Sequence, residues 1–366
     1  MTIKTLNSLS LPVENDVLLT VPQFTDWAKL TEKNSKLVTQ SRKELLRAAI
    51  NYTKTTIDMP CPTEDLRCTV VTGHQPEWHH CGIAAKSIVS YHLAQKLGAY
   101  CIHLILDHDT GSSKLRMPVI QKNKWAIKEF ELENDCDKLP FEFRSSAQLD
   151  QILTFVDACV ADHKYFCQSA WQEIRAKLTI GRFRNLADTI MFLQAKVYAK
   201  MGIDMLYLPV SKMSSTKVFL HFAASIIKDA EFFVNIYNKA TGNSRNNDGY
   251  KPRILKIDSI NKTFELPFWV VSSHGKRMPL FVNINRTETI LLADDREFLR
   301  GDLGNIDLSC FEIKEALQRH GWYLRPKALT LTLFVRMYFA DWFVHGIGGA
   351  KYEPIVDCIL KEYFGI

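Results

Sequence analysis

Two apolar runs, each ending in polar residues, indicate the fold of this 366-residue chain. The first reads Val70-Val71-Thr72-Gly73-His74-Gln75-Pro76, and the second ends at Leu106-Asp107-His108-Asp109. A histidine-rich loop and a segment of helical periodicity, 83–97, lie between them. This order predicts a strand, a loop, a helix and a second, parallel strand. In an open parallel sheet, ligands bind beyond the carboxyl ends of the strands, where these polar residues fall.

The elements around this unit extend the same pattern. Gly98 is expected to end the helix as its C′ residue, and 100–106 is a near-continuous apolar run typical of a buried parallel strand. A third apolar strand is expected at 204–210. Helices are expected at 37–53, 149–177, 185–201, 217–238, 307–319, 328–343 and near the C-terminus.

Two other segments have a period of two. Residues 111–146 alternate apolar and charged side chains, which predicts a small antiparallel insertion, and 264–271 with 278–282 predict a hairpin. Residues 1–35 look irregular, and 243–251 is the best candidate for a mobile loop. We expect an α/β fold with a Rossmann-like parallel sheet flanked by helices and a helical C-terminal region. The expected units are a leader at 1–60, a nucleotide-binding core at 61–250, and a hairpin with helices at 251–366.

Composition excludes several classes of protein. Hydrophobic residues make up 46% and charged residues 23%, which is typical of a soluble globular enzyme. The net charge of +6 is mild and suits anionic small molecules better than nucleic acid. We see neither a secretory signal nor an uninterrupted membrane span. The nine cysteines are irregularly spaced without a CxxC pair, which fits a reducing cytoplasm. The sequence does not indicate an oligomeric state.

The loop after the first strand is the first candidate site. Three histidines occur within seven residues, and we expect His74, His79 and His80 to donate hydrogen bonds to charge that develops during phosphoryl or adenylyl transfer. Backbone amides at the start of the next helix could bind phosphate. The cofactor-binding residues expected here are Gly73, Gln75, Gly82 and Lys86. A single histidine in such a loop is commonly structural, but three are harder to dismiss.

Asp107 and Asp109 form the second candidate, at the end of the second strand. Two carboxylates around an imidazole could bind a substrate amine, hold Mg²⁺, or serve as acid and base. The alternative is a turn in which Asp109 caps local backbone amides. The sequence leaves both open.

A third candidate follows the third strand. Lys212-Met213-Ser214-Ser215-Thr216 resembles the Lys-Met-Ser-Lys-Ser loop of class I aminoacyl-tRNA synthetases and related nucleotidyltransferases, but Ser215 stands at the second lysine. That resemblance implies that Lys212 neutralises a triphosphate, with Ser214 and Ser215 as hydroxyl ligands. The alternative is a helix cap at Ser214 or Ser215.

The last candidates lie near the C-terminus. Arg325 precedes a predicted helix, and Gly348 with Gly349 precedes another. Glycines permit close approach of the backbone to a ligand. A helix hinge with ordinary surface basic residues is the alternative.

These segments together resemble the bacillithiol-synthesis cysteine-adding enzymes. That family has a Thr-Gly-Gln-Gln-Pro-Gly loop and a later Glu-Asp-His-Asp, and this chain has 72–76 and 107–109 in the same order. The family's Leu-Arg-Pro, Gly-Gly and Phe-Gly-Ile elements match 324–326, 348–349 and 364–366. Here His74 replaces the first glutamine of the loop, Glu77 replaces its last glycine, and Leu106 replaces the glutamate. The identities are confined to these short motifs.

The resemblance implies a nucleotidyltransferase-type core and a ligase that joins an amino acid, cysteine in the family, to a small-molecule amine. ATP or another nucleotide, with Mg²⁺, would be the cofactor. Two alternatives remain. The histidines and the Asp-His-Asp turn could supply metal ligands to a hydrolase, although their spacing fits no standard zinc pattern. A non-catalytic nucleotide-binding protein could also retain this fold without the chemistry.

Overall fold

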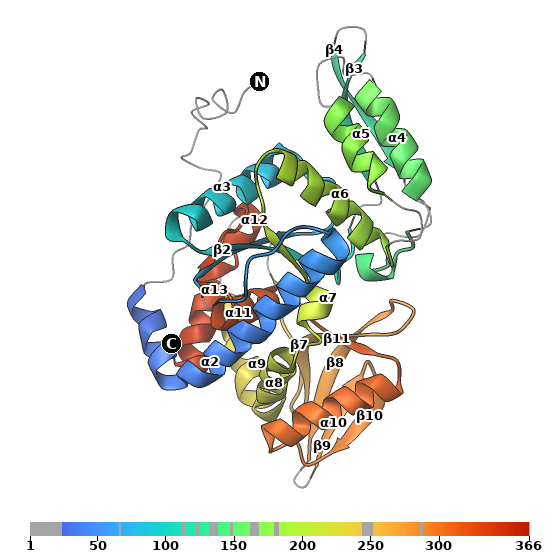
Figure 1. Ribbon diagram of the computed structural model, residues 1–366. Helices are drawn as coiled ribbons and strands as arrows, with labels where there is room; N and C mark the ends of the chain where they lie inside the picture. The colour runs from blue at the N-terminus through green and yellow to red at the C-terminus, as the bar shows by residue number, and fades with distance from the viewer. Residues whose placement is uncertain are drawn as a thin grey trace.

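The computed structural model describes residues 24–65, 67–111, 114–121, 124–131, 138–146, 149–161, 168–178, 183–243, 252–285 and 288–365. Within these ranges the chain forms a mixed α/β structure with one parallel sheet, one antiparallel sheet and a separate hairpin (Figure 1). The predicted α/β class with a helix-flanked parallel sheet is confirmed. None of the described helices is long and apolar enough to cross a membrane.

The parallel sheet has four strands in the order β12-β1-β2-β5. These strands are β1 (Thr69–His74), β2 (Tyr100–Ile105), β5 (Leu206–Pro209) and β12 (Trp342–Phe343). Strand β1 pairs with β2 in parallel, as predicted, and β2 pairs with β5. The helix between β1 and β2 is α3 (Cys81–Leu97), which ends at Gly98 with φ 59°. The order therefore places the carboxyl ends of all four strands along one edge.

Both faces of this sheet are covered because its strands are apolar on both sides. Leu104 and Leu208 face a core formed with α2 (Phe24–Tyr52) and α11 (Ala328–Tyr338). Cys101 and Ile105 face a core formed with α3 and α6 (Leu186–Lys200). The continuous run of β2 thus divides its side chains between two cores.

The C-terminal third contains more strand than predicted. Five strands lie in the order β10-β9-β8-β7-β11, and β6 pairs with β7. Helix α10 (Ile306–Arg319) packs beside this antiparallel sheet at the lower end of the molecule (Figure 1). The strands are β6 (Ile257–Asp258), β7 (Thr263–Val271), β8 (Arg277–Ile284), β9 (Thr289–Ala293), β10 (Arg296–Gly301) and β11 (Tyr323–Pro326). The predicted hairpin is β7–β8, but it is the centre of a larger sheet.

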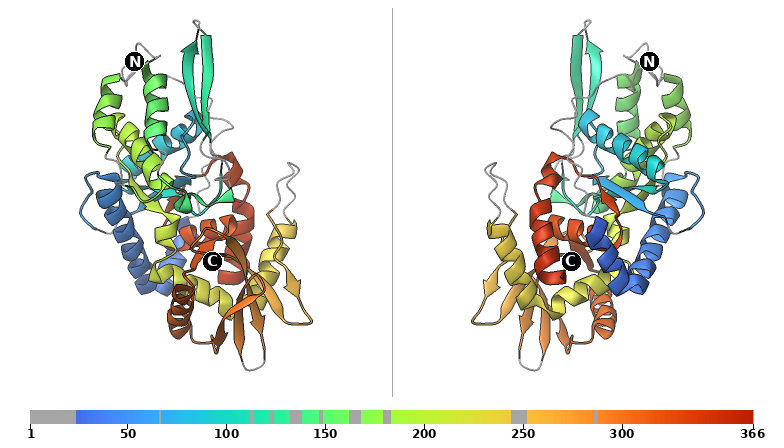
Figure 2. Two further views of the ribbon diagram at one scale, coloured as in Figure 1. Left: turned by 90° about the vertical axis from the view of Figure 1, so that its right-hand side faces the viewer. Right: turned by 90° about the vertical axis from the view of Figure 1, so that its left-hand side faces the viewer.

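The predicted insertion is an antiparallel hairpin that projects from the opposite end of the molecule (Figure 2). It consists of β3 (Lys114–Gln121) and β4 (Lys124–Glu131). Helix α4 (Leu149–Ala161) contacts both strands of the hairpin, and α5 (Gln168–Ala176) contacts α4 and α6. The short η3 (Phe141–Phe143) contacts α6.

Several predicted helix boundaries differ from those in the structure. The helix expected at 217–238 breaks at Asp229 into α8 (Lys217–Lys228) and α9 (Ala230–Asn243), and residues 24–35, expected to be irregular, belong to α2. The segment expected as one helix at 149–177 is α4 and α5. The expected loop at 243–251 lies outside the described residues apart from Asn243.

The helix expected at 328–343 ends at Tyr338, and the chain then enters the parallel sheet as β12. Asp341, just before β12, contacts two residues that are distant from it in sequence. Asp341 accepts a hydrogen bond from the Thr69 backbone at 2.8 Å and pairs with Arg42 at 2.8 Å. The remaining short elements of the fold are η1 (Thr53–Ile57), α7 (Val210–Met213), α12 (Ile347–Ala350), α13 (Glu353–Ile359) and η4 (Leu360–Phe364).

Candidate functional site

A cavity of about 430 Å³ lies at the carboxyl ends of β1, β2 and β12. We call it the strand-end pocket. Its walls come from the loop after β1, helix α3, the end of β2, strands β7 and β8, and the segments around α11 and α12. It therefore joins parts of the chain that are far apart in sequence. The predicted site residues that line it are Gly73, His74, Gln75, Lys86, Asp109, Gly348 and Gly349.

Gly73 shapes the entrance to the loop because β1 and β2 approach closely there. A Cβ atom at this position would lie 2.8 Å from the Leu104 backbone oxygen and 2.9 Å from the Leu104 Cβ. Real Cβ atoms do not approach other atoms so closely, so only glycine fits without moving the sheet. The chain can then turn at His74 while still paired with β2.

Asp109 is the centre of a small polar network in the pocket. Its Oδ2 accepts a hydrogen bond from the Gln75 amide at 3.0 Å, and its Oδ1 lies 3.3 Å from Nη1 of Arg277. The guanidinium of Arg277 also lies 5.4 Å from the centre of the Trp269 ring. Of the described residues that line the pocket, Asp109 alone carries a carboxylate. Its negative charge is therefore already matched by Arg277.

Burial sets the protonation of the pocket's other polar groups. Burial, with the nearby charge of Lys86, lowers the pKa of His74 to about 4, and burial lowers the pKa of His108 to about 4. Both imidazoles are neutral at pH 7 and can donate or accept a hydrogen bond. Burial also lowers the pKa of Lys86 to about 8, and its ammonium donates to the Gly73 carbonyl at 2.6 Å. Lys86 and Arg277 therefore supply the positive charge.

The pocket residues that were not predicted as site residues include His108, Trp269, Arg277 and His345. His108 lies within the Asp-His-Asp turn, and His345 precedes the predicted glycines. Both are therefore close in sequence to residues that were predicted as site residues. Arg277 and Trp269 could not be predicted as site residues, because the sequence around them indicates an ordinary hairpin.

Two of the three predicted histidines lie elsewhere. His79 points into the protein, where its Nδ1 lies 3.0 Å from the Tyr198 hydroxyl, and burial lowers its pKa well below the usual value. His80 is the N-cap of α3 and accepts from the Gly82 backbone at 3.1 Å. Neither side chain lines the strand-end pocket, nor does Gly82. The structure thus gives His80 and Gly82 a capping role.

Asp107 is also outside the pocket. It is 3% exposed and accepts hydrogen bonds from the backbone and hydroxyl of Ser211, the former at 2.9 Å. Burial, together with the negative charge of Glu142, raises its pKa to about 7. The predicted binding of a substrate amine by Asp107 is therefore not supported by its position. Its observed contact joins the ends of β2 and β5.

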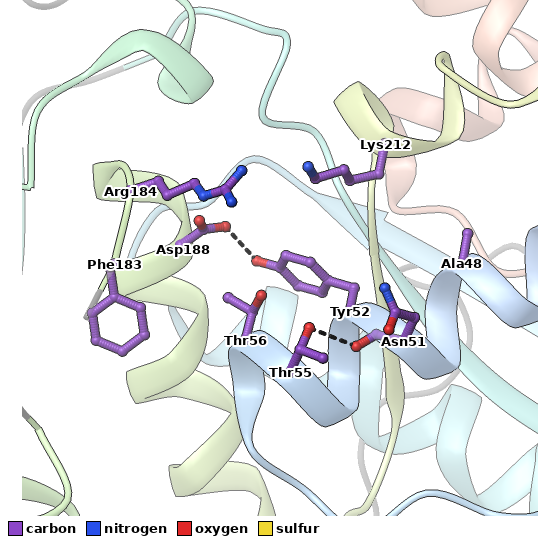
Figure 3. Close-up of a pocket in the computed structure, with 9 residues that line it drawn as sticks. All are labelled: Ala48, Asn51, Tyr52, Thr55, Thr56, Phe183, Arg184, Asp188 and Lys212. Carbon is purple, nitrogen blue, oxygen red and sulfur yellow. Dashed lines mark hydrogen bonds between the residues drawn. The ribbon is translucent and has the colours of Figure 1, made fainter.

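The predicted triphosphate loop does not reach the pocket. Lys212 lines a different cavity with Tyr52 and Asp188 (Figure 3). The Ser214 hydroxyl donates to the Val210 carbonyl and that of Ser215 to the Ser211 carbonyl, so both are used within the turn. The N-cap of α8 is Thr216, one residue beyond the predicted positions.

Arg325 lies with Ser214 and Ser215 at a third cavity, of about 350 Å³. Its side chain is 4% exposed and pairs with Glu142. The strand-end pocket therefore brings His74 and Asp109 together, whereas His79, His80, Asp107 and Lys212 lie outside it.

Neither the known protein families nor the curated proteins contain a match to this chain. Within the described ranges, no three histidine, cysteine, aspartate or glutamate side chains are grouped so that they could share a metal ion.

Proposed function

We propose that the protein is a nucleotide-dependent ligase that joins the carboxyl group of an amino acid to a small-molecule amine, with the nucleotide bound in the strand-end pocket. The observation that carries this proposal is that two cations, Lys86 and Arg277, lie with one carboxylate, Asp109, and with neutral imidazoles at the carboxyl ends of parallel strands. We also propose that the parallel sheet is a Rossmann-like core, since such sheets bind nucleotides at this edge.

The pocket has the properties that an anionic, aromatic ligand requires. Its volume of about 430 Å³ falls in the range of sites for small molecules and cofactors. Lys86 and Arg277 would neutralise phosphate oxygens, and the partly exposed Trp269 ring offers a surface for a base. Gly348 and Gly349 would let the ligand approach the backbone closely.

The proposed reaction has two steps. The amino acid's carboxylate attacks the α-phosphorus of ATP and pyrophosphate leaves, and the amine then attacks the acyl carbon and AMP leaves. Nδ1 of His74, neutral at pH 7, lies 3.2 Å from the Gln75 carbonyl oxygen, so the one ring proton is used there and Nε2 would act as an acceptor. Mg²⁺ would enter with the triphosphate. The amine loses one proton as the amide bond forms, and a neutral imidazole in the pocket can accept it.

Equilibrium binding of ATP with Mg²⁺, measured by titration calorimetry, tests the pocket. We expect the His74→Ala and Arg277→Met variants to weaken binding at least about tenfold, the loss expected when a charged or hydrogen-bonding partner is removed. His92→Ala is the matched control, because His92 is exposed on α3 and does not line the pocket. Absence of ATP binding, or binding that none of these variants weakens, would refute the nucleotide site.

A second assay tests the ligase chemistry. The pure protein is incubated with ATP, Mg²⁺, a pool of amino acids and a pool of amines, and the release of AMP and pyrophosphate is followed. Release that depends on both pools supports the proposal. Nucleotide binding without release would favour the non-catalytic alternative. The irregular spacing of the cysteines, without a CxxC pair, supports a further proposal that the protein functions in the cytoplasm.

A further inference from the structure

A second cavity, of about 480 Å³, lies beside the carboxyl end of β5 and is separate from the strand-end pocket. We call it the Lys212 cavity. Its walls come from the C-terminal part of α2, the turn of η1, the start of α6 and the short helix α7 (Figure 3). None of its lining residues lines the strand-end pocket.

The charges in this cavity are arranged around one hydrogen bond. The Tyr52 hydroxyl donates to Oδ1 of Asp188 at 2.6 Å. Figure 3 shows the charged ends of Arg184 and Lys212 facing one another above this hydrogen bond. Burial raises the pKa of Asp188, while the charges of Lys212 and Arg184 act in the opposite direction. Two cations and one carboxylate therefore share the cavity.

The structure leaves these charged groups available to a ligand. Among the described residues, none forms an ion pair or hydrogen bond with the charged ends of Arg184 and Lys212, and none donates to Oδ2 of Asp188. Tyr52 fixes the carboxylate from the protein side, and the N-terminus of α6 holds its backbone, since Asn185 accepts from the Asp188 amide at 2.8 Å. The carboxylate is therefore positioned before a ligand arrives.

We propose that the Lys212 cavity binds a small zwitterion, an α-amino acid. Arg184 and Lys212 would bind its carboxylate, and Oδ2 of Asp188 would bind its ammonium group. Phe183 and Ala48 supply apolar atoms at opposite sides of the cavity, and Thr56 offers a hydroxyl (Figure 3). A simple anion would use the two cations but would gain nothing from Asp188, which therefore indicates the zwitterion.

One set of contacts joins this cavity to the strand-end pocket. Lys212 follows Ser211, and Ser211 holds the buried Asp107 through its backbone and its hydroxyl. Asp107 directly precedes His108 and Asp109, which line the other pocket. Amino-acid binding in this cavity does not depend on the proposed function, because the cavity shares no lining residue with the pocket proposed for the nucleotide.

Binding of each of the L-amino acids to the full chain without nucleotide tests this inference. Thermal-shift screening selects the amino acid, and titration calorimetry then gives its affinity. We expect Arg184→Met, Lys212→Met and Asp188→Asn each to weaken binding at least about tenfold, because each removes a charge-assisted contact. Lys228→Met is the matched control, since Lys228 is an exposed lysine on α8 outside the cavity.

Two analogues sharpen the result. The decarboxylated amine and the deaminated acid of the selected amino acid should both bind more weakly than the amino acid itself, and Asp188→Asn should no longer distinguish the amino acid from the deaminated acid. Inorganic phosphate is the probe for a simple anion site.

The inference fails if no L-amino acid binds at millimolar concentration, or if binding withstands both Arg184→Met and Lys212→Met. Phosphate binding that Asp188→Asn strengthens, without amino-acid binding, also refutes it. Failure of this inference can be told from failure of the proposed function, because the two are tested at different sites. The proposed function is tested by ATP binding to the strand-end pocket and by the loss of that binding in His74→Ala.

Discussion

The guanidinium of Arg325 contacts both carboxylate oxygens of Glu142, at 2.9 Å from Nε to Oε1 and at 2.7 Å from Nη2 to Oε2. Both side chains are less than one-tenth exposed. The Glu142 backbone amide in turn donates to the Asp107 carbonyl at 2.8 Å. This pair therefore connects β11 of the antiparallel sheet to the carboxyl end of β2.

The first prediction concerns the stability that depends on this pair. We expect Arg325→Met to lower the free energy of unfolding by about 3–5 kcal/mol, because it leaves the Glu142 charge buried without its partner. Urea unfolding measures it. Arg300→Met is the control, since Arg300 is exposed and its ion pairs contribute less than about 1 kcal/mol. Equal losses in the two variants would contradict the structural role of Arg325.

The second prediction is a loss of stability in mild acid. His74 and His108 have pKa values of about 4 in the folded protein, below the ordinary value of 6.5. The unfolded chain therefore binds more protons below pH 6.5. The stabilisation is fully present above that pH and is lost as the pH falls toward 4, by about 1 kcal/mol per pH unit for each histidine.

Urea unfolding at pH 7, 6 and 5 measures this dependence. His74→Gln should have a shallower dependence than the parent chain, whereas His92→Gln, which alters an exposed histidine, should match the parent. An unchanged slope in His74→Gln would show that His74 is not buried as a neutral imidazole.

The third prediction links Lys86 to nucleotide binding. Its pKa of about 8 means that about half of the free protein lacks this charge at pH 8. A bound anion favours the charged form, so binding should take up part of a proton near pH 8 and weaken as the pH rises further. Calorimetry in buffers of different ionisation enthalpy measures the uptake. It should vanish in Lys86→Met and persist in Lys96→Met, which changes an exposed lysine of the same helix.

The fourth prediction compares two neighbouring glycines. A Cβ atom at Gly349 would lie 2.6 Å from Nδ1 of His345, whereas one at Gly348 would have nothing within 4 Å. The His345 ring is confined, because its Nε2 lies 2.6 Å from Oε1 of the buried Glu353. We expect Gly349→Ala to destabilise the protein by about 1–3 kcal/mol through overpacking. Gly348→Ala should have little effect on the melting temperature, and similar shifts in both variants would refute the argument.

Local pattern determined the parallel unit. The apolar runs of β1 and β2, the helical period of α3 and the glycine after it are properties of adjacent residues, so the sequence predicts them and their parallel pairing. The predicted β7–β8 and β3–β4 hairpins rest on the same local alternation. Because strand ends in a parallel sheet share one edge, His74 after β1 and Asp109 after β2 line the same pocket.

Only the tertiary structure decided which polar residues face a ligand. Strand β12 joins the sheet because Asp341 meets Thr69 and Arg42, which are distant in sequence. Arg277 reaches the pocket through the packing of one sheet against the other, and Lys212 faces a separate cavity because β5 lies at the edge of the sheet. Periodicity along a chain fixes which face a side chain occupies, but long-range packing fixes what that face meets.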